Sequence, residues 1–591
     1  MSHRLSSVTI VNYRSIRSHT FNLSEYTPLI GYNNAGKTNI IRAIKWLLRK
    51  TSLGSDCFYD PLQAVEVFGI IEGITEELLS ALPANHRTTL RPFIANEKIQ
   101  IKRVQNRPGE GMASIKLLVK NPLIEDDEDS WRPNPNGIDA ALTGLFPDPI
   151  HIGAMENAEE DVSKSKSTST IGKLLAEIIN PIEEIYGDRV RTALSSFQSL
   201  LDADGRDRAS ELDRFDETMN SKIDDFFPDV KVKLHIPTPE LKEVFSKGTI
   251  KVYEENGASG RDVASFGHGA QRSIQMALIR HLAELKRSEE DVNTCTMLLI
   301  DEPELYLHPQ AIEVVKDALK QLSKDGYQII FSTHSAMMLT HEDVCNAIIV
   351  RKSIEEGTYK RDTVRSAIYH LMHDAPSQLQ LLFSFGNASS ILFSERVILT
   401  EGTTEERVLP HVIKKLKGKP LGLLKCALIR QGGSGSTRKS MLVLHAMNIP
   451  CKAIVDLDYA CRNSVQDGYL AEDDVDLIGC KTVLTSLARE HDFRCDSSGW
   501  PCKGGAINAS DAFALLAEHE DGAQFIGNLH SKLKAYNIWT WTKGTIEDHL
   551  PIAGKSEQHW ADFVTSFEVL PPETVIANHP DVIDCIGWLM A

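Results

Sequence analysis

Apolar and polar residues alternate near the start of the chain. Apolar side chains fall at Leu5, Val8, Ile10 and Val11, and again at Phe21 and Leu23. A repeat of about two residues is typical of strands with one buried face, so a strand pair is predicted here. Similar patterns predict further strands that end at Ile30 or lie over 65–71, 99–119 and 149–153.

Between residues 171 and 227 the apolar residues follow a helical spacing instead. They recur at intervals of about three or four positions, at Leu174, Leu175, Ile178, Ile179, Ile182 and Ile185. Two interpretations of this stretch are open: a projecting arm that joins two chains, or a helical layer buried against the rest of the protein. Strand patterns return over 230–236 and 249–253.

Another α/β pattern begins at Arg396. Apolar segments typical of strands alternate with helical segments, the strands lying over 396–400, 427–430, 452–455 and 537–541. Such alternation predicts βαβ units and a parallel sheet. We therefore expect an α/β fold class for the chain and a main domain boundary near residue 390.

Length and charge narrow the possible functions. The chain has 591 residues, enough for about three to five domains. It carries 64 Lys and Arg residues against 81 Asp and Glu residues, a net charge of −17, which excludes a purely electrostatic coat for nucleic acid. A local basic groove, or a metal ion between protein and phosphate, remains compatible with this charge.

Two further features concern the compartment. Apolar runs fall short of the ~20 residues of a membrane span, so no membrane partner is expected. Ten cysteines are ordinary for a chain of this length, which indicates a reduced, cytoplasmic protein.

A phosphate-binding motif follows the strand that ends at Ile30. Residues 31–38, Gly-Tyr-Asn-Asn-Ala-Gly-Lys-Thr, fit G-x-x-x-x-G-K-[ST] and precede a helix, which is the context that the motif requires. Its glycines let backbone N–H groups surround phosphate oxygens, and the helix N-terminus favours their negative charge. We expect Lys37 to contact the β- and γ-phosphates and Thr38 to bind Mg²⁺.

Two later strand ends supply groups for nucleotide hydrolysis. The apolar segment 297–300 leads to Asp301 and Glu302. Asp301 suits a position that binds the water ligands of Mg²⁺, and Glu302 suits the base that activates water. The apolar segment 329–331 leads to Ser-Thr-His-Ser. His334 is then expected to sense the γ-phosphate, although a lone histidine is more often structural.

These residues resemble the ABC-type ATPases of the SMC and RecF group. The likeness extends to Val-Asn-Tyr-Arg-Ser-Ile over 11–16, and to Asp-Glu-Pro-Glu over 301–304 with Leu-His-Pro over 307–309. In that group two heads enclose ATP, and each gives a signature loop to the other's nucleotide. The resemblance implies nucleotide contacts, beside Asp301, for Arg14, Asn34, Ala35, Gly36, Lys37, Thr38 and Asn39.

The candidate signature loop is Ser-Phe-Gly-His-Gly-Ala-Gln-Arg over 265–272. The resemblance implies that Gly269 and Gln271 contact the nucleotide. His268 stands where the group has serine, which leaves the γ-phosphate contact and the hydrolysis rate open. The glutamine-loop residue of the group has no identified counterpart in this sequence.

Carboxylates follow the strands of the second α/β unit. The side chains concerned are Glu401, Glu405, Asp456, Asp458 and Glu547. The carboxyl ends of parallel strands meet at one edge of a sheet, so we expect these side chains to converge. Oxygen ligands select Mg²⁺ or Mn²⁺, and two such ions can flank a scissile phosphate.

The order Glu-Gly-x-x-Glu, a glycine-rich turn and Asp-x-Asp resembles the Toprim domain of primases, topoisomerases and some nucleases. The resemblance implies acid–base work or metal binding for Glu401, and metal binding for the other four carboxylates. A basic residue is also needed beside the phosphate. Lys543 and Lys555 are both candidates, and the choice between them stays open.

The two halves together resemble the OLD (overcoming lysogenisation defect) nucleases of the single-gene class, over essentially the whole chain. The implied domains are an ABC ATPase in two parts (1–155 and 229–375), a helical dimerisation insertion (156–228), a connector (376–392) and a Toprim nuclease domain (393–591). The family implies ATP and Mg²⁺ or Mn²⁺ at the ATPase site and two Mg²⁺ or Mn²⁺ ions in the Toprim domain. It also implies a DNA substrate, a homodimer or higher even oligomer, and defence against phage.

Other functions fit the sequence less well. An ATP-gated DNA clamp or sensor with a non-cleaving Toprim is the main alternative, but the carboxylate set is complete. A topoisomerase would need a tyrosine nucleophile in a separate domain, and a primase usually has a zinc module; neither signature is evident. The DNA preference, the effect of ATP on cleavage and a regulatory partner cannot be inferred from this sequence.

Overall fold

The protein is represented by a computed structural model. Apart from isolated positions, it describes residues 3–124, 128–133, 135–146, 149–153, 185–189, 197–227, 230–236, 250–253, 259–289, 295–361, 385–571 and 579–591. Much of the predicted helical insertion and of the predicted connector lies outside the described residues. Within them, no helix is both long and apolar enough to cross a membrane.

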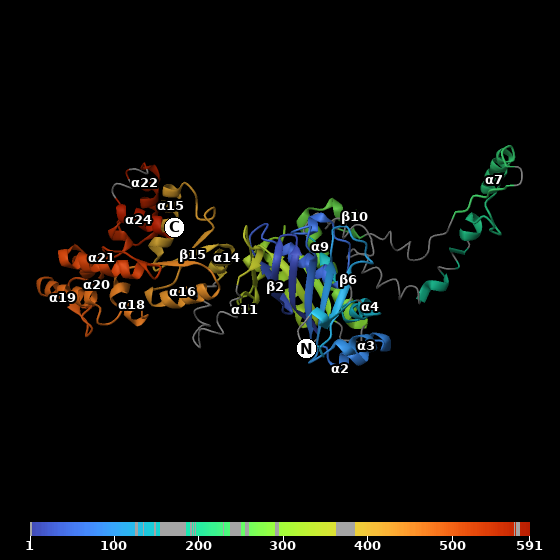
Figure 1. Cartoon of the computed structure of the whole chain (residues 1–591). Coiled ribbons are helices and arrows are strands. Elements are labelled where there is room, and N and C mark those ends of the chain that lie inside the picture. Colours follow the sequence, from blue (N-terminus) through green and yellow to red (C-terminus); the bar gives the residue numbers. More distant parts are fainter. Residues whose placement is uncertain are drawn as a thin grey trace.

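The N-terminal domain is built on a mixed sheet whose strand order, over the described residues, is β7-β6-β5-β4-β1-β2-β14-β13-β3-β12-β11-β8. The first part is antiparallel: β1 (Arg4–Tyr13), β2 (Ile16–Asn22), β4 (Val65–Glu72), β5 (Lys98–Gln105), β6 (Lys116–Lys120), β7 (Trp131–Pro133) and β14 (Gly357–Lys360). The second part is parallel: β13 (Ile348–Ser353), β3 (Tyr26–Ile30), β12 (Tyr327–Thr333), β11 (Thr296–Asp301) and β8 (Ile150–Ile152). The sheet occupies the centre of Figure 1.

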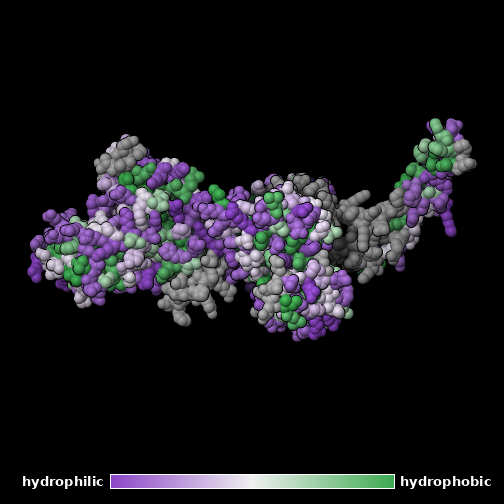
Figure 2. All heavy atoms as spheres, in the orientation of Figure 1, coloured by the Kyte–Doolittle hydropathy of each residue, from purple (hydrophilic) through white to green (hydrophobic). Residues whose placement is uncertain are grey.

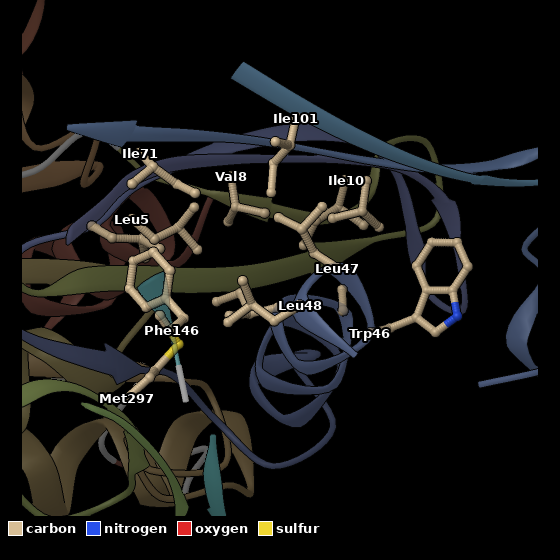
Figure 3. Packing of buried hydrophobic residues seen from close by; sticks show 14 of the residues in the cluster. Leu5, Val8, Ile10, Trp46, Leu47, Leu48, Ile71, Ile101, Phe146 and Met297 are labelled. Carbon is tan, nitrogen blue, oxygen red and sulfur yellow. The ribbon is translucent and has the colours of Figure 1, made fainter. Parts of the chain in front are cut away.

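The main N-terminal core lies between this sheet and helix α1 (Lys37–Leu48). Strand β4 alternates strictly between buried and half-buried positions, as expected for a strand with one face on a core. Figure 3 shows Leu47 and Leu48 of α1 directed at side chains of the antiparallel strands, among them Val8 and Ile10. The parallel strands β11 and β12 are buried along their whole length. Other helices of this domain are α2 (Glu76–Ala81), α3 (Ala84–Leu90), α4 (Ile138–Leu145), α9 (His268–Glu289), α10 (Pro309–Lys324) and α11 (His341–Asn346).

The C-terminal domain has a parallel sheet in the order β16-β15-β17-β20, which confirms the predicted α/β class. Its strands are β15 (Arg396–Thr400), β16 (Cys426–Arg430), β17 (Cys451–Val455) and β20 (Ile538–Thr540). One face packs on α16 (Thr437–Ala446), α19 (Val475–Glu490), α20 (Ala509–Glu518) and α21 (Glu520–Lys534). The other packs on α15 (Thr403–Lys417), α22 (Glu557–Val569) and α24 (Pro580–Met590).

Smaller elements complete this domain. Asp456 is the N-cap of the short helix α17 (Leu457–Cys461), which α18 (Asn463–Gln466) follows. A small hairpin of β18 (Arg494–Cys495) and β19 (Pro501–Cys502) precedes α20. Because β15, β16, β17 and β20 are parallel, the residues that follow them lie at one edge of the sheet.

The described part of the helical insertion stands away from both domains (Figure 1). Helix α7 (Ser210–Ile223) buries only Asp216, and Phe215, Met219, Phe226 and Phe227 are exposed. Figure 2 shows hydrophobic side chains gathered on this arm. The described residues therefore form a projecting arm and not a buried helical layer.

One strand predicted beside the arm is absent from the structure. The strand predicted over 230–236 is wrong, because these residues have no regular structure. They run along α7 instead: the N–H of Val232 donates to Asn220 Oδ1 (2.7 Å) and that of Leu234 to Asp216 Oδ1 (2.9 Å). Side-chain amide and carboxylate groups thus take the place of a second strand.

The two domains pack directly on each other. Helix α14 (Phe385–Phe393) enters the C-terminal domain, and its Ile391 shares a buried cluster with Ile349 of β13. Arg351 Nη2 donates to the carbonyl oxygens of Leu392 (2.8 Å) and Ser394 (3.0 Å). This boundary is called the domain seam below.

Candidate functional sites

The phosphate-binding motif forms a tight loop between β3 and α1. Asn34 and Gly36 have φ values of 66° and 106°, in the left-handed region that favours glycine. A Cβ atom on Gly36 would lie 2.2 Å from Thr358 Oγ1, so only glycine fits there. The loop lines a cavity of about 330 Å³, whose lining residues are Asn33, Asn34, Ala35, Gly36, Lys37, Thr38, Asn39, Glu302 and His334.

Lys37 is buried inside this loop. Its ammonium donates to the carbonyl oxygens of Gly31 (2.9 Å) and Tyr32 (3.1 Å) and lies 2.8 Å from His334 Nε2. Burial lowers the pKa of Lys37 to about 8. The loop's own carbonyls thus hold the cation at the position where a phosphate would replace them as its acceptors.

Asp301 and Thr38 come together across the parallel strands. Thr38 Oγ1 and Ser332 Oγ both donate to Asp301 Oδ1, each at 3.0 Å. A hydroxyl and a carboxylate at this spacing beside a phosphate loop fit the oxygen donors that Mg²⁺ prefers. The residues present therefore suit a Mg²⁺ ion that accompanies nucleotide.

Glu302 and His334 meet in the same cavity. His334 Nε2 lies 3.0 Å from Glu302 Oε1 as well as 2.8 Å from Lys37 Nζ. One nitrogen cannot serve both, so it donates to Glu302 when protonated and otherwise accepts from Lys37. The hydrogen bond from His334 lowers the pKa of Glu302, which keeps this carboxylate ionised.

Two groups that hold this site together were missed by sequence reasoning. Arg272 Nη2 donates to the carbonyl oxygens of Asp301 and Glu302, both at 2.9 Å. Glu304 Oε1 accepts from Thr333 Oγ1 (2.7 Å) and from the N–H of His334 (2.8 Å). Both residues lay inside quoted motifs, but only long-range packing shows what they bind.

Three other residues that were predicted to contact nucleotide, Arg14, Gly269 and Gln271, do not line this cavity. Arg14 donates to Asp56 Oδ2 (3.0 Å) and Cys57 Sγ (3.3 Å). Gln271 Nε2 donates to the carbonyl oxygen of Phe266 (2.8 Å), and Gly269 packs so closely on Tyr306 that a Cβ would lie 2.8 Å from its carbonyl oxygen. In this chain, Gly269 and Gln271 thus lie against neighbouring backbone and not on the wall of the phosphate-loop cavity.

In the C-terminal domain, Glu401 and Asp456 follow the neighbouring strands β15 and β17. The N–H of Asp456 donates to Glu401 Oε2 at 3.1 Å. Glu405 lies in the first turn of α15 and is buried. Asp458 is half-buried, and its Oδ1 has no hydrogen-bond partner within the described structure.

Glu547 follows β20 and faces α15. Its Oε1 accepts from Thr404 Oγ1 (2.6 Å), and its Oε2 lies 3.6 Å from Lys555 Nζ. Lys543 instead pairs with Asp581 (3.3 Å). Of the two lysines that the sequence offered, Lys555 therefore stands beside the carboxylates.

A cavity of about 440 Å³ opens at this edge of the sheet. Its wall includes Asp456, Asp458, Arg462, Cys502, Lys503, Ser510, Thr545 and Lys555. Glu401, Glu405 and Glu547 are not on this wall. The structure thus divides the predicted set into two carboxylates on the cavity wall and three that are not.

The carboxylates lie close enough to hinder one another's ionisation. Burial, followed by the charges of neighbouring carboxylates, raises the pKa of Asp456 to about 9 and that of Glu401 to about 7. The pKa values of Glu405 and Asp458 are also raised, mainly by burial. A divalent cation would relieve this repulsion, and the all-oxygen donor set suits Mg²⁺ or Mn²⁺.

The donors are not gathered into a closed cage. Over the ranges described, no three or more His, Cys, Asp or Glu side chains form a ready metal-binding group. Mg²⁺ keeps several waters and is commonly held by one or two carboxylates together with phosphate. The open arrangement fits that mode of binding.

The pH dependence of Tm should reveal the repulsion among the carboxylates of the C-terminal domain. A carboxyl whose pKa rises on folding contributes stability that is fully present below its unfolded pKa, 3.8 for Asp456, and is lost as the pH rises through its folded pKa of about 9. In EDTA, we expect Tm to fall between pH 6 and pH 8, and millimolar Mg²⁺ to raise Tm more at pH 8. Asp456→Asn should weaken both effects, and an unchanged dependence in that variant would contradict the assignment.

Two family models match the two domains of the chain. The family model described as "AAA domain, putative AbiEii toxin, Type IV TA system" matches residues 27–339. The model "Overcoming lysogenization defect protein-like, TOPRIM domain" matches residues 392–458. The matched ranges contain the phosphate loop with Asp301 and Glu302, and the Glu401 to Asp458 carboxylates.

Relatives extend the similarity to the full length. The chain is 38% identical over 600 residues to "Old nuclease" of Escherichia phage P2, covering 100% of both chains. It is 21% identical to "Endonuclease GajA" of Bacillus cereus (strain VD045), covering 83% of this chain and 80% of that one. An SMC head bound to the C-winged helix domain of ScpA aligns with 62% of this chain and 99% of its own, at 17% identity and a TM-score of 0.38. The 38% identity to the phage P2 protein over the full length shows that the chain belongs to the Old (overcoming lysogenization defect) nuclease family, and the two family models show an ATPase domain followed by a Toprim domain.

Proposed function

We propose that this protein is an ATP-hydrolysing, divalent-metal-dependent DNA endonuclease that acts in defence against phage. The observation that carries the nuclease assignment is one cavity at the carboxyl edge of the Toprim sheet that brings Asp456, Asp458 and Lys555 together. The family relationship supports cleavage, since "Old nuclease" and "Endonuclease GajA" are names of its relatives.

The Toprim residues have separable roles in this proposal. Two Mg²⁺ or Mn²⁺ ions, held by Asp456 and Asp458 with Glu401, Glu405 and Glu547, would polarise the scissile phosphate and acidify the attacking water. Without metal, burial raises the pKa of Glu401 to about 7, so that it can take up a proton near neutral pH; a bound cation would instead favour its ionised, metal-binding form. The ammonium of Lys555 balances the charge that develops on the phosphate.

The ATPase residues divide the work in a similar way. Lys37 exchanges its carbonyl acceptors for the β- and γ-phosphates, and Thr38 and Asp301 hold the accompanying Mg²⁺. Ionised Glu302 accepts a proton from the attacking water, and His334 contacts the γ-phosphate. The signature loop with Gly269 and Gln271 serves the nucleotide of a second head.

This arrangement needs at least two copies of the chain. The exposed apolar side chains of the α7 arm include Phe215 and Met219, and clusters of this kind mark contact surfaces between proteins. We therefore propose a homodimer or higher even oligomer, joined through the arm, with DNA as substrate.

A pair of lysine variants tests the nuclease assignment. Lys555→Ala should lower the cleavage rate of supercoiled plasmid by about 10²–10³-fold, the usual effect of removing one group that stabilises the transition state. Lys543→Ala removes the same charge from an ion pair that is 59% exposed on the lysine side, and its rate should stay within about threefold of wild type. Equal losses in both variants, or none in either, would refute the proposed role of Lys555.

A further inference from the structure

Positive charges gather at the domain seam, outside the two cavities described above. Arg351 lies on β13, and Arg361 directly follows β14, its N–H donating to the carbonyl oxygen of Ile349 (2.8 Å). Arg396 begins β15, and Lys452 lies near the start of β17. The cluster therefore stands at the amino edge of the Toprim sheet, opposite the edge that carries Asp456.

Arg351 and Arg361 are buried, Arg396 and Lys452 are half-buried, and none of the four is paired with a carboxylate among the described residues. Arg351 is 2% exposed and Arg361 is 8% exposed. Arg361 Nη2 reaches only the carbonyl oxygen of Glu395 (3.4 Å), and Nη1 is buried with no hydrogen-bond partner in the described part of the chain. A buried guanidinium with an unsatisfied nitrogen is costly unless an anion completes it.

The other two cations also bond to carbonyl groups. Arg396 Nη1 donates to the carbonyl oxygen of Met590 (3.2 Å), and Lys452 Nζ donates to that of Trp588 (2.5 Å). The nearby carboxylate of Glu395 is already paired with Lys425 (2.6 Å). Burial and the neighbouring charge of Arg396 lower the pKa of Lys452, as expected where cations repel one another.

A cavity of about 340 Å³ lies between these groups. Its wall combines Arg361, Arg396 and Lys452 with Glu395 and with apolar or small residues, namely Val397, Ile398, Pro450, Cys451, Leu589 and Ala591. This volume is at the lower end of the range for small-ligand sites, about 300–1,000 Å³, which are mostly apolar with a few convergent polar groups.

We propose that this seam cavity binds a small phosphate-bearing anion, from inorganic phosphate or pyrophosphate up to a mononucleotide. Two guanidinium groups and an ammonium match the several acceptor oxygens and the multiple charge of phosphate better than a single carboxylate. The ligand would complete the unsatisfied Arg361. This site lies beyond the proposed function, because neither ATP hydrolysis nor DNA cleavage uses it.

Such a ligand would tie the two domains together. Arg361 comes from the ATPase domain, whereas Arg396 and Lys452 come from the Toprim domain. Arg351 and Lys425 beside the cavity also lie over the ring of Tyr32 in the phosphate loop, at 5.8 Å and 4.8 Å from its centre. Binding at the seam should therefore raise the stability of the whole chain by mass action.

Calorimetric titration of the full chain tests the proposal. The parent protein is Lys37→Ala, which disables the phosphate loop, and the probes are inorganic phosphate, pyrophosphate and ADP. We expect at least one probe to bind with one site per chain and to raise Tm. Adding Arg361→Met or Lys452→Met should weaken binding at least tenfold, while adding Arg407→Met, which removes a 51% exposed cation paired with Glu557, should not.

Two seam variants are used because Arg361 is buried and Lys452 is half-buried. If one variant fails to fold, the other still tests the proposal. The order of the three affinities identifies the source of the phosphate group. The proposal is overturned if the Lys37→Ala chain binds none of the probes, or if both folded seam variants bind as tightly as their parent. It is also overturned if a short DNA duplex, and no small probe, depends on Lys452.

Discussion

Asp456→Asn is expected to abolish DNA cleavage while leaving ATP hydrolysis intact. The substitution removes one cavity-wall carboxylate and preserves its shape. A bound metal ion supplies several kcal/mol of transition-state stabilisation, and a loss of about 4 kcal/mol corresponds to a rate about 10³-fold lower. Plasmid cleavage and phosphate release, measured on the same preparation, provide both rates.

Folding should not limit this experiment. Asp456 has its pKa raised to about 9, so it is largely protonated at neutral pH without metal, and asparagine resembles that form. Asp521→Asn, an exposed change on α21 of the same domain, is the matched control and should cleave normally. Full cleavage by Asp456→Asn would place the chemistry elsewhere in the chain.

Glu302→Gln is expected to have the largest effect on ATP hydrolysis. Removing a general base lowers a rate by about 10²–10⁴-fold, and glutamine can still accept the hydrogen bond from His334. Nucleotide binding should persist, because Lys37 and the loop backbone remain. Lys37→Ala should instead lose binding and hydrolysis together, which fluorescent-nucleotide binding and phosphate release distinguish.

A nearby glutamate serves as control for this prediction. Glu313→Gln changes an exposed carboxylate on α10 and should hydrolyse ATP at the wild-type rate. Unchanged hydrolysis in Glu302→Gln, together with normal folding, would mean that another group activates water.

Local sequence patterns predicted the parts of both sites that local chemistry determines. The phosphate loop was predictable because a strand, a glycine-rich turn and a helix are contiguous, and Gly36 is required by its own backbone conformation. The carboxylates after β15 and β17 were predictable because carboxyl ends of parallel strands share one edge. The sequence did not predict which of the carboxylates line the cavity, since this depends on how α15 and α17 pack.

Sequence patterns did not predict the contacts between distant segments of the chain. Lys543 and Lys555 both flank Glu547 in the sequence, and only the structure separates them: Lys555 lies 3.6 Å from Glu547, whereas Lys543 pairs with Asp581. Arg272 acts through carbonyl oxygens, which have no sequence signature. The apolar pattern over 230–236 resembled a strand, but its backbone groups bond to side chains of α7.

Cleavage of supercoiled plasmid by the wild-type chain tests the central claim most directly. The reactions contain Mg²⁺, Mn²⁺ or EDTA, with and without ATP, and phosphate release is followed in parallel. The account predicts nicked or linear product with a divalent ion under at least one nucleotide condition, and none in EDTA. Steady ATP hydrolysis without product under any metal would contradict it and would favour an ATP-gated DNA clamp or sensor.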